Sequence, residues 1–209
     1  MSTFVLIFEI LGTIAFALSG AMTGLKKEMD IFGVAILGLT TAVGGGILRD
    51  LVLGIAPPTT FQKPVYALVA IVVSILAFLP GIRRQLMRRQ AVYEKILLLM
   101  DSIGLGVFTV VGIQIAFGTA GEYNAFLYIF VGVITGIGGG ILRDVLAGNT
   151  PYIFVKHIYA SASIIGAVVC TLIWPVAGSL AAMLTGAALI VIIRLLSAHY
   201  KWNLPKARP

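Results

Sequence analysis

A seven-residue block, GGGILRD, occurs at residues 44–50 and again at residues 138–144. In both copies three glycines, which are poor helix formers, precede an arginine–aspartate pair, which is costly to bury in hydrocarbon. If the helix unwinds at the glycines, the freed carbonyl oxygens must face protein or water, and they are suitable ligands for Na⁺ or K⁺. Close contact between helices through small residues is the alternative interpretation. Because the triplet is duplicated and each copy precedes charges, we predict a broken, pore-lining helix at each block.

The charges that follow the triplets have two open interpretations. Arg49 and Asp50 follow the first triplet, and Arg143 and Asp144 follow the second. In a straight helix these pairs approach the membrane interface, where arginine reaches the headgroups at little cost. In a broken helix they lie deeper, where a charge must be paired or hydrated. Arg49 and Arg143 would then act as charge partners or gating charges, and the aspartates would attract cations.

Two further acids, Glu9 and Asp101, lie within apolar stretches. Ionisable residues inside a membrane are candidates for function, so we expect both either to attract cations at the two mouths of a path or to pair with the arginines. Thr41 and Thr135 offer hydroxyl groups before the triplets, although threonine commonly donates to its own helix instead. The backbone of both triplets is the expected ligand of Na⁺ or K⁺. The predicted ion path comprises Glu9, Thr41, Gly44, Gly45, Gly46, Asp50, Asp101, Thr135, Gly138, Gly139, Gly140 and Asp144.

The composition predicts that a membrane surrounds these elements. Of 209 residues, 59% are hydrophobic and 11% are charged, and the mean hydropathy is +1.06. The core of a soluble protein of this length cannot hide so much apolar surface, so we expect an all-α membrane protein. Apolar windows of about 20 residues, the length of one bilayer crossing, predict seven transmembrane helices. They cover residues 4–25, 31–53, 64–82, 95–117, 125–147, 157–174 and 178–197.

The basic residues predict the orientation of these helices. An odd number of spans places the two termini on opposite sides of the membrane. Thirteen of the 15 lysines and arginines fall on the carboxyl-terminal side, against Arg49 and Lys63 on the other. By the positive-inside rule, the amino terminus faces out and the carboxyl terminus faces the cytoplasm. The basic stretch RRQLMRRQ at residues 83–90 is interpreted as a topology determinant, with an anionic-lipid site as the alternative.

The repeat extends well beyond the block. Glu9, Gly12, Phe16 and Gly20 in the first span align with Asp101, Gly104, Phe108 and Gly112 in the fourth. Downstream, Phe61, Lys63, Tyr66 and Ala67 align with Phe154, Lys156, Tyr159 and Ala160. Because a three-span unit reverses its own orientation, the second copy must be inserted upside down. We predict an inverted 3+3 repeat of residues 1–93 and 94–176, a seventh helix at 177–197 and a cytoplasmic tail at 198–209.

Catalysis and nucleic-acid binding are not indicated. The sequence shows no nucleophile–histidine–acid set, metal-ligand cluster or phosphate-binding loop, and GGGILRD lacks the strand-then-helix context of a nucleotide site. The net charge of +7 comes from residues between apolar stretches, which fits membrane topology better than nucleic acid. The lone Cys170 is expected to be a small buried hydrophobe. We expect no enzyme activity and no cofactor, with permeant K⁺ or Na⁺, and optionally lipid, as ligands.

Two GGGILRD blocks, in the second and fifth of seven spans, resemble the trimeric intracellular cation (TRIC) channel family, its prokaryotic branch in particular. The likeness covers about residues 4–197. It implies a homotrimer whose protomers each carry a pore for K⁺ and Na⁺, with the second and fifth helices kinked at the glycines. It also implies a multi-pass location in the prokaryotic plasma (inner) membrane. Some bacterial relatives are associated instead with uptake of small amino acids such as glycine.

The combined expectation is a passive, K⁺-permeable cation channel in the lipid bilayer. The first alternative is a secondary transporter of a small amino acid such as glycine, in which helix amino ends would hold the substrate carboxylate. The second alternative is a membrane scaffold that transports nothing. The small-residue faces of the last two spans permit tight association of subunits but do not indicate how many subunits assemble. The expectation of a trimer therefore depends on the resemblance.

Overall fold

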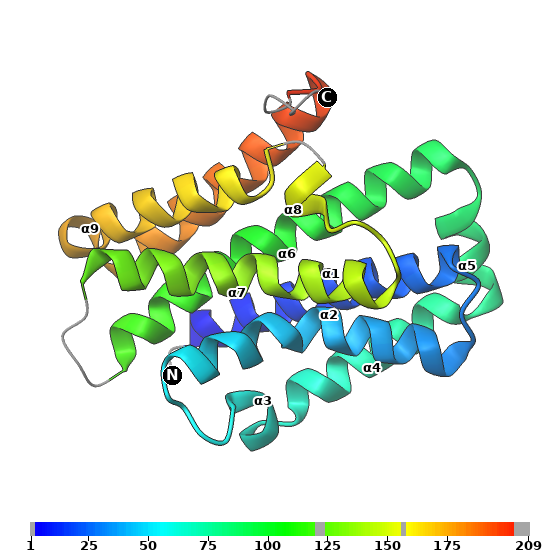
Figure 1. Ribbon diagram of the computed structural model, residues 1–209, viewed down its shortest axis with the longest axis horizontal. Coiled ribbons are helices and arrows are strands. Elements are labelled where there is room, and N and C mark those ends of the chain that lie inside the picture. The colour runs from blue at the N-terminus through cyan, green and yellow to red at the C-terminus, as the bar shows by residue number, and fades with distance from the viewer. Residues whose placement is uncertain (1–2, 120–123, 156–157, 203–209) are drawn as a thin grey trace, which may run out of the picture.

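Helices account for all regular secondary structure in residues 3–119, 124–155 and 158–202, the part of the chain described by this computed structural model (Figure 1). This agrees with the rule that backbone N–H and C=O groups in lipid must be satisfied within their own segment. Three of the basic residues behind the predicted orientation, Lys156, Lys206 and Arg208, lie outside the described residues. The helices are α1 (Thr3–Lys26), α2 (Ile31–Val52), α3 (Thr59–Gln62), α4 (Val65–Phe78), α5 (Pro80–Met87), α6 (Gln90–Gly118), α7 (Ala125–Leu146), α8 (Tyr152–Val155) and α9 (Ala160–His199).

The helices that carry the two blocks, α2 and α7, begin and end in the same way. Asp30 accepts a hydrogen bond of 2.7 Å, and Asn124 one of 3.0 Å, from the backbone N–H three residues further on. Each helix therefore starts with a side-chain cap. Beyond the other end, Gly54 and Gly148 adopt φ values of 70° and 65°, the left-handed conformation in which glycine commonly ends a helix.

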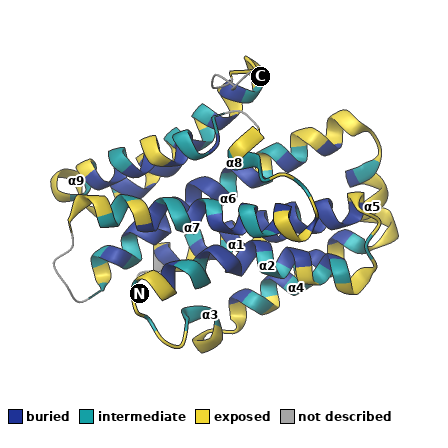
Figure 2. Cartoon of the chain, viewed as in Figure 1, coloured by how far each residue is buried: buried dark blue, intermediate teal, exposed yellow. Residues whose placement is uncertain are grey.

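Helices α1 and α6 form the centre of the molecule. α1 contacts α2, α4 and α6, while α6 also contacts α7 and α9, and α2 crosses α7. Figure 2 shows the buried residues gathered on these inner helices. The outward faces carry exposed large apolar side chains such as Phe32, Leu68 and Phe126. Such an exterior is suited to lipid.

Five helices, α1, α2, α6, α7 and α9, are long and apolar enough to cross a membrane, and the bent pair α4–α5 makes six if it is counted as one span. The predicted third span, 64–82, is wrong at its carboxyl end. α4 stops at Phe78, and the axis of α5, which begins at Pro80, differs from that of α4 by 78°. Proline lacks an N–H group and disfavours helical conformation in the preceding residue, so the helix ends there.

α9 folds back on itself at Gly178, which has a φ of 79° and a ψ of 170°. Its two arms run side by side (Figure 1), and Gly166 of the first arm meets Gly186 of the second: a Cβ on Gly166 would lie 2.9 Å from the carbonyl oxygen of Gly186. Cys170 is fully buried beside this contact, as a small hydrophobe would be. The break falls at the predicted boundary between the sixth and seventh spans.

The predicted break at the glycine triplets is wrong for this structure. α2 and α7 each run through their triplet as one continuous α-helix. They cross so closely there that a Cβ on Gly45 would lie 2.1 Å from the carbonyl oxygen of Thr135, and a Cβ on Gly139 2.1 Å from that of Thr41. The absence of side chains allows backbone-to-backbone contact, which offsets the low helix propensity of glycine. The alternative interpretation, close helix contact, describes what the structure shows.

Candidate functional site

The crossing of α2 and α7 is reciprocal. Each helix places a threonine carbonyl oxygen against a glycine of the other. The hydroxyl groups of Thr41 and Thr135 donate to the carbonyl oxygens of Leu37 and Val131, each at 2.6 Å and each four residues back in the same helix. In this state the hydroxyl protons, and the carbonyl groups of both triplets, are engaged within their own helices.

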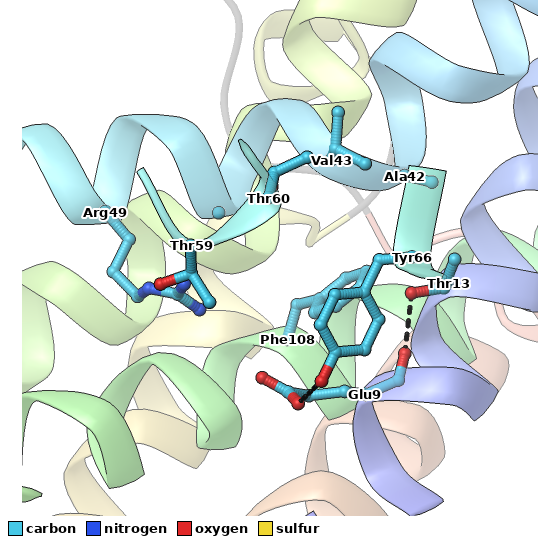
Figure 3. Close-up of a pocket in the computed structure, with 10 residues that line it drawn as sticks. Glu9, Thr13, Ala42, Val43, Arg49, Thr59, Thr60, Tyr66 and Phe108 are labelled. Atoms are coloured by element: carbon cyan, nitrogen blue, oxygen red, sulfur yellow. Dashed lines mark hydrogen bonds between the residues drawn. The ribbon is translucent and has the colours of Figure 1, made fainter. Parts of the chain in front are cut away.

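The first charged cluster lies beside the triplet of α2 and consists of Glu9, Arg49, Asp50 and Tyr66. Nε and Nη2 of Arg49 both lie 2.8 Å from Oδ1 of Asp50. The other carboxylate oxygen of Asp50 accepts a hydrogen bond of 2.6 Å from the backbone N–H of Thr59, which ties the start of α3 to the end of α2. Tyr66, on α4, donates its hydroxyl to the Glu9 carboxylate (Figure 3).

A small cavity borders the first cluster. Its volume is about 30 Å³, enough for one water molecule. Glu9, Arg49 and Tyr66 line it together with Gly46, the last glycine of the first triplet, and Figure 3 shows the Glu9 and Arg49 side chains on either side of this space. The ion pairs among the described residues do not include one between Glu9 and Arg49. The Glu9 carboxylate therefore has a tyrosine, rather than an arginine, as its direct partner.

The second charged cluster lies beside the triplet of α7 and consists of Asp101, Arg143, Asp144 and Arg194. Nε of Arg143 donates to Oδ1 of Asp144 at 2.9 Å, and Nη1 donates to Oδ1 of Asp101 and to Oγ of Ser19, both at 2.6 Å. The second oxygen of Asp144 accepts a hydrogen bond of 2.9 Å from the backbone N–H of Tyr152, at the start of α8. Because Ser19 belongs to α1, Arg143 joins the two halves of the chain.

The two clusters share one hydrogen-bond plan. In each, an arginine bonds the aspartate that follows it, and that aspartate holds the first N–H group of the next short helix. The helix ends also match, since Ile55 and Asn149 each donate a backbone hydrogen bond of 2.8 Å to the carbonyl oxygen of the cluster aspartate five residues before. The sequence repeat is thus reproduced in the local geometry.

The clusters differ in the surroundings of the acid on the central helix. Glu9 bonds Tyr66, whereas Asp101 bonds Arg143 and lies 3.6 Å from Nη2 of Arg194. Tyr159 occupies the position that aligns with Tyr66. Its hydroxyl has no hydrogen-bond partner among the described residues, and its ring faces the Arg194 guanidinium at 4.7 Å. Arg194 comes from the second arm of α9, which the first half of the chain lacks.

All these charges are enclosed by protein. The exposed fraction is 5% for Arg49 and 1% for Arg143, so interfacial anchoring is the wrong interpretation for both. Desolvation makes such charges expensive unless partners and hydrogen bonds compensate. With two acids and one arginine, the first cluster has a formal charge of −1, whereas two acids and two arginines bring the second to zero. The balance of charge therefore differs between two sites of the same plan.

The sequence indicated most of these residues but not their partners. Every predicted acid and arginine falls in one of the two clusters. The predicted threonines and the first two glycines of each triplet lie at the crossing, whereas Gly46 faces Arg49 and Gly140 faces Tyr159. Ser19, Tyr66, Tyr159 and Arg194 were missed as site residues. The sequence did carry a signal for the two tyrosines, which align in the repeat, and for Arg194, which is a charge inside a predicted span. Ser19 carries no such signal.

The fold and the clusters define a multi-pass helical membrane protein with buried charges on either side of a glycine crossing. The family model described as "Glycine transporter" matches residues 6–80 and 98–175, one stretch in each half. A UPF0126 membrane protein of Deinococcus radiodurans is 36% identical over 206 residues, which cover 96% of this chain and 90% of the relative. The UPF0126 inner membrane protein YadS of Escherichia coli K12 is 38% identical over 200 residues, 94% of this chain and 93% of the relative. The chain belongs to the UPF0126 membrane protein family.

Solved structures with the same fold are prokaryotic TRIC channels. The TRIC trimeric intracellular cation channel orthologue from Rhodobacter sphaeroides is 33% identical, with a TM-score of 0.87 over 96% of this chain and all of that one. A prokaryotic TRIC channel solved in 0.5 M KCl is 30% identical, with a TM-score of 0.88 over 98% of this chain and 100% of that chain. A further TRIC cation channel, described for its conductance, is 34% identical with a TM-score of 0.83 over 97% of both chains.

Proposed function

We propose that the protein is a monovalent cation channel that conducts K⁺, and also Na⁺, through a path inside each protomer of a homotrimer. The observation that carries this proposal is the similarity to three prokaryotic TRIC channels, each at least 30% identical over at least 96% of this chain. The same similarity supports an assembly of three copies.

The geometry supports a path that runs from the first cluster, past the crossing, to the second cluster. The cavity beside Glu9 would be its first hydrated segment, because it is lined by charged groups and has room for water. Glu9 and Asp50 at one end, and Asp101 and Asp144 at the other, would favour cations over anions along its length.

The crossing would be the gate of this path, and the structure described above would be its closed state. Opening would require α2 and α7 to bend or separate at their triplets, where glycine permits backbone rearrangement. Only then would the triplet carbonyls and the hydroxyls of Thr41 and Thr135 become ligands for a passing ion. Moving one charge through the full membrane potential contributes about 2.3 kcal/mol per 100 mV. A displaced Arg49 or Arg143 would therefore make opening depend on voltage.

The membrane topology belongs to the same proposal. Counting the two arms of α9 and the α4–α5 pair as spans gives seven crossings. The matched clusters support an inverted repeat of residues 1–93 and 94–176, followed by the span 177–197. The excess of basic residues on one side would place the amino terminus outside and the tail, 198–209, in the cytoplasm of a prokaryotic cell.

Single-channel recording of the purified protein in planar bilayers tests the proposal. With a KCl gradient across the bilayer, we expect unitary currents that reverse close to the K⁺ equilibrium potential and persist when Na⁺ replaces K⁺. Currents that reverse at the Cl⁻ potential would contradict a cation path. Crosslinking in detergent should give a trimer, and a monomer or dimer would contradict the proposed homotrimer.

The second candidate function is secondary transport of glycine, because the family model that matches both halves carries that description. Proteoliposomes with an inward Na⁺ or H⁺ gradient would then accumulate labelled glycine with saturable kinetics. Saturable uptake without unitary K⁺ currents would favour this carrier, and unitary currents without uptake would favour the channel.

A further inference from the structure

Glu9 differs from the other three buried cluster acids in the partner of its carboxylate. Asp50, Asp101 and Asp144 each accept a hydrogen bond of 2.6–2.9 Å from an arginine. The Glu9 carboxylate instead accepts the hydroxyl hydrogen of Tyr66, a neutral donor. Glu9 is only 5% exposed, so protein replaces most of the water that would stabilise its charge. Among the residues that the structure describes, it is thus the buried cluster acid without an arginine in direct contact.

This difference decides which cluster acid can take up a proton without breaking the buried network. Protonation of Asp101 would remove one of the two charges that stabilise the enclosed guanidinium of Arg143, which is energetically costly. Tyr66 carries no charge that depends on Glu9. Its hydroxyl can donate to a carboxylate and can also accept from a carboxylic acid, because it has one proton and free lone pairs. The contact between Glu9 and Tyr66 can therefore persist in both protonation states.

The cavity beside Glu9 brings water to the carboxyl group. It has room for one water molecule, and its wall includes the hydroxyl-bearing side chains of Thr13, Thr59 and Thr60. Thr59 and Thr60 are only half-buried, so this space lies close to the protein surface. The second carboxylate oxygen of Glu9 points away from the Tyr66 hydroxyl (Figure 3). A water molecule in the cavity can therefore exchange a proton both with Glu9 and with the solution.

The charged neighbours of Glu9 act on it in opposite directions. Arg49 and Lys63 favour the carboxylate, whereas Asp50 and enclosure by protein favour the neutral acid. Lys63 is exposed, so solvent screens its charge. From α6, the cavity wall receives the ring of Phe108, which carries no charge. Because these influences oppose one another, both protonation states are accessible and the pH of the solution selects between them.

We propose that Glu9 is a proton-binding site that controls cation flux, and that Tyr66 holds its carboxyl group in position. The proton moves from a water molecule in the cavity to a carboxylate oxygen of Glu9, and it returns to water when the pH rises. Its uptake changes the formal charge of the first cluster from −1 to zero and removes the charge that would favour cations there. K⁺ flux should therefore be high when Glu9 is ionised and low when it is protonated. This inference rests on the proposed function, whereas proton binding itself can be measured without conduction.

Infrared difference spectroscopy of the detergent-solubilised protein tests proton binding directly. Spectra are recorded between about pH 4 and pH 9, which covers ordinary and buried glutamates, and the C=O band of the carboxylic acid is followed. We expect the wild type to gain this band reversibly on acidification, and Glu9→Gln to lack that part of the signal. Glu9→Asp should restore it, because it returns a carboxyl group. A Glu9 signal that stays constant across this range would refute the proton site.

Bilayer recording at different pH values tests the effect on flux. In a KCl gradient, the reversal potential gives the permeability of K⁺ relative to Cl⁻. Acidification should lower this ratio about fivefold, the equivalent of about 1 kcal/mol for one charge lost beside the path, and should reduce the unitary current with it. Glu9→Gln should show the low ratio at every pH, because it has the shape and the zero charge of the protonated acid.

The two aligned tyrosines form a matched pair of variants for the role of Tyr66. Tyr66→Phe removes a hydrogen bond that stabilises the carboxylate, so the midpoint of both pH responses should move to higher pH by about one unit. Tyr159→Phe removes the hydroxyl at the equivalent position of the other half, which has no hydrogen-bond partner within the described part of the chain. It should leave the midpoint unchanged. Equal shifts in the two variants, or no shift in either, would show that Tyr66 does not position Glu9.

The two kinds of measurement separate failure of this inference from failure of the proposed function. Unitary cation currents whose pH dependence survives in Glu9→Gln would leave the channel in place and overturn its control by Glu9. A complete lack of currents would refute the channel and with it the control of flux. The infrared titration would still decide whether Glu9 binds a proton.

Discussion

The first and second charged clusters are two versions of one site. Both have an arginine bonded to the following aspartate, and both use that aspartate to hold the start of a short helix. The first cluster borders a water-sized cavity and has one more acid than arginine. The second gains Arg194 from the second arm of α9 and reaches formal neutrality. The second arm of α9 has therefore changed the charge balance of the second cluster, while Arg143 supplies the hydrogen bonds that connect it.

This difference shows that the crossing and the charged clusters have separate roles, although the sequence repeat places both in the same block. The crossing needs both halves equally, because each contributes a glycine and a threonine carbonyl to the same contact. The clusters do not have to be equal, since each is built around its own arginine. Changes at the crossing should therefore have symmetric effects, and changes in the clusters should have unequal effects.

The largest expected difference lies between the two arginines of the repeated block. Arg143→Gln should lower the free energy of unfolding by about 3–5 kcal/mol, because Asp101 and Asp144 would stay buried without the guanidinium that donates to both. Arg49→Gln should cost less than half of that, since Arg49 serves one aspartate and borders a cavity that can hydrate it. Chemical unfolding in detergent, followed by tryptophan fluorescence, measures both values. Equal losses would show that the clusters are energetically alike.

The crossing should respond equally to Gly45→Ala and Gly139→Ala. Each new methyl group would meet a backbone carbonyl oxygen 2.1 Å away, so we expect a loss of about 1–3 kcal/mol in stability. The same wedge should raise the open probability in bilayer recordings, if the crossing is the gate. Gly46→Ala is the matched control within one triplet, because its Cβ would lie 3.7 Å from Nη2 of Arg49, an ordinary contact with a flexible side chain. If all three variants lost stability and open probability, the cause would lie within each helix and not in the contact between α2 and α7.

A third contrast concerns the two aligned tyrosines. Tyr66→Phe removes the hydroxyl that bonds Glu9 and should cost about 1–3 kcal/mol, in the range for hydrogen bonds to charged groups. Tyr159→Phe should be nearly neutral, because its hydroxyl has no hydrogen-bond partner among the described residues. Thermal unfolding of the two variants in one detergent measures this contrast. A larger loss from Tyr159→Phe would reveal a partner of that hydroxyl.

Much of the fold could be predicted because hydropathy and repeats are long-range patterns. The apolar windows located α1, α2, α6 and α7, and the predicted gap between the spans 157–174 and 178–197 anticipated the turn at Gly178. The end of α4 at Phe78 was missed because the apolar run continues through Leu79 and Ile82. Hydropathy does not register the geometric effect of Pro80, which changes direction without changing polarity.

The state of the triplets could not be predicted from helix propensity alone. Propensity assigns a cost to each glycine in isolation, but it cannot show what faces the glycine. Here each triplet faces the other, and the contact stabilises a continuous helix on both sides. The duplication itself was the available signal, because two matching small-residue faces can serve as each other's partner. Arg194 was likewise visible as an intramembrane charge, yet its place beside Asp101 depends on how α9 folds back.

The Gly45–Thr135 and Gly139–Thr41 contacts have the form of an isologous interface, in which one surface meets a copy of itself. A half-length chain with a single triplet would thus already possess the surface needed to dimerise in antiparallel fashion. Fusion of two such genes would preserve that surface while freeing the remaining positions to diverge. Neither half could then acquire a side chain at its crossing glycine unless the backbone of the other half moved away. Substitutions at these two positions are therefore coupled.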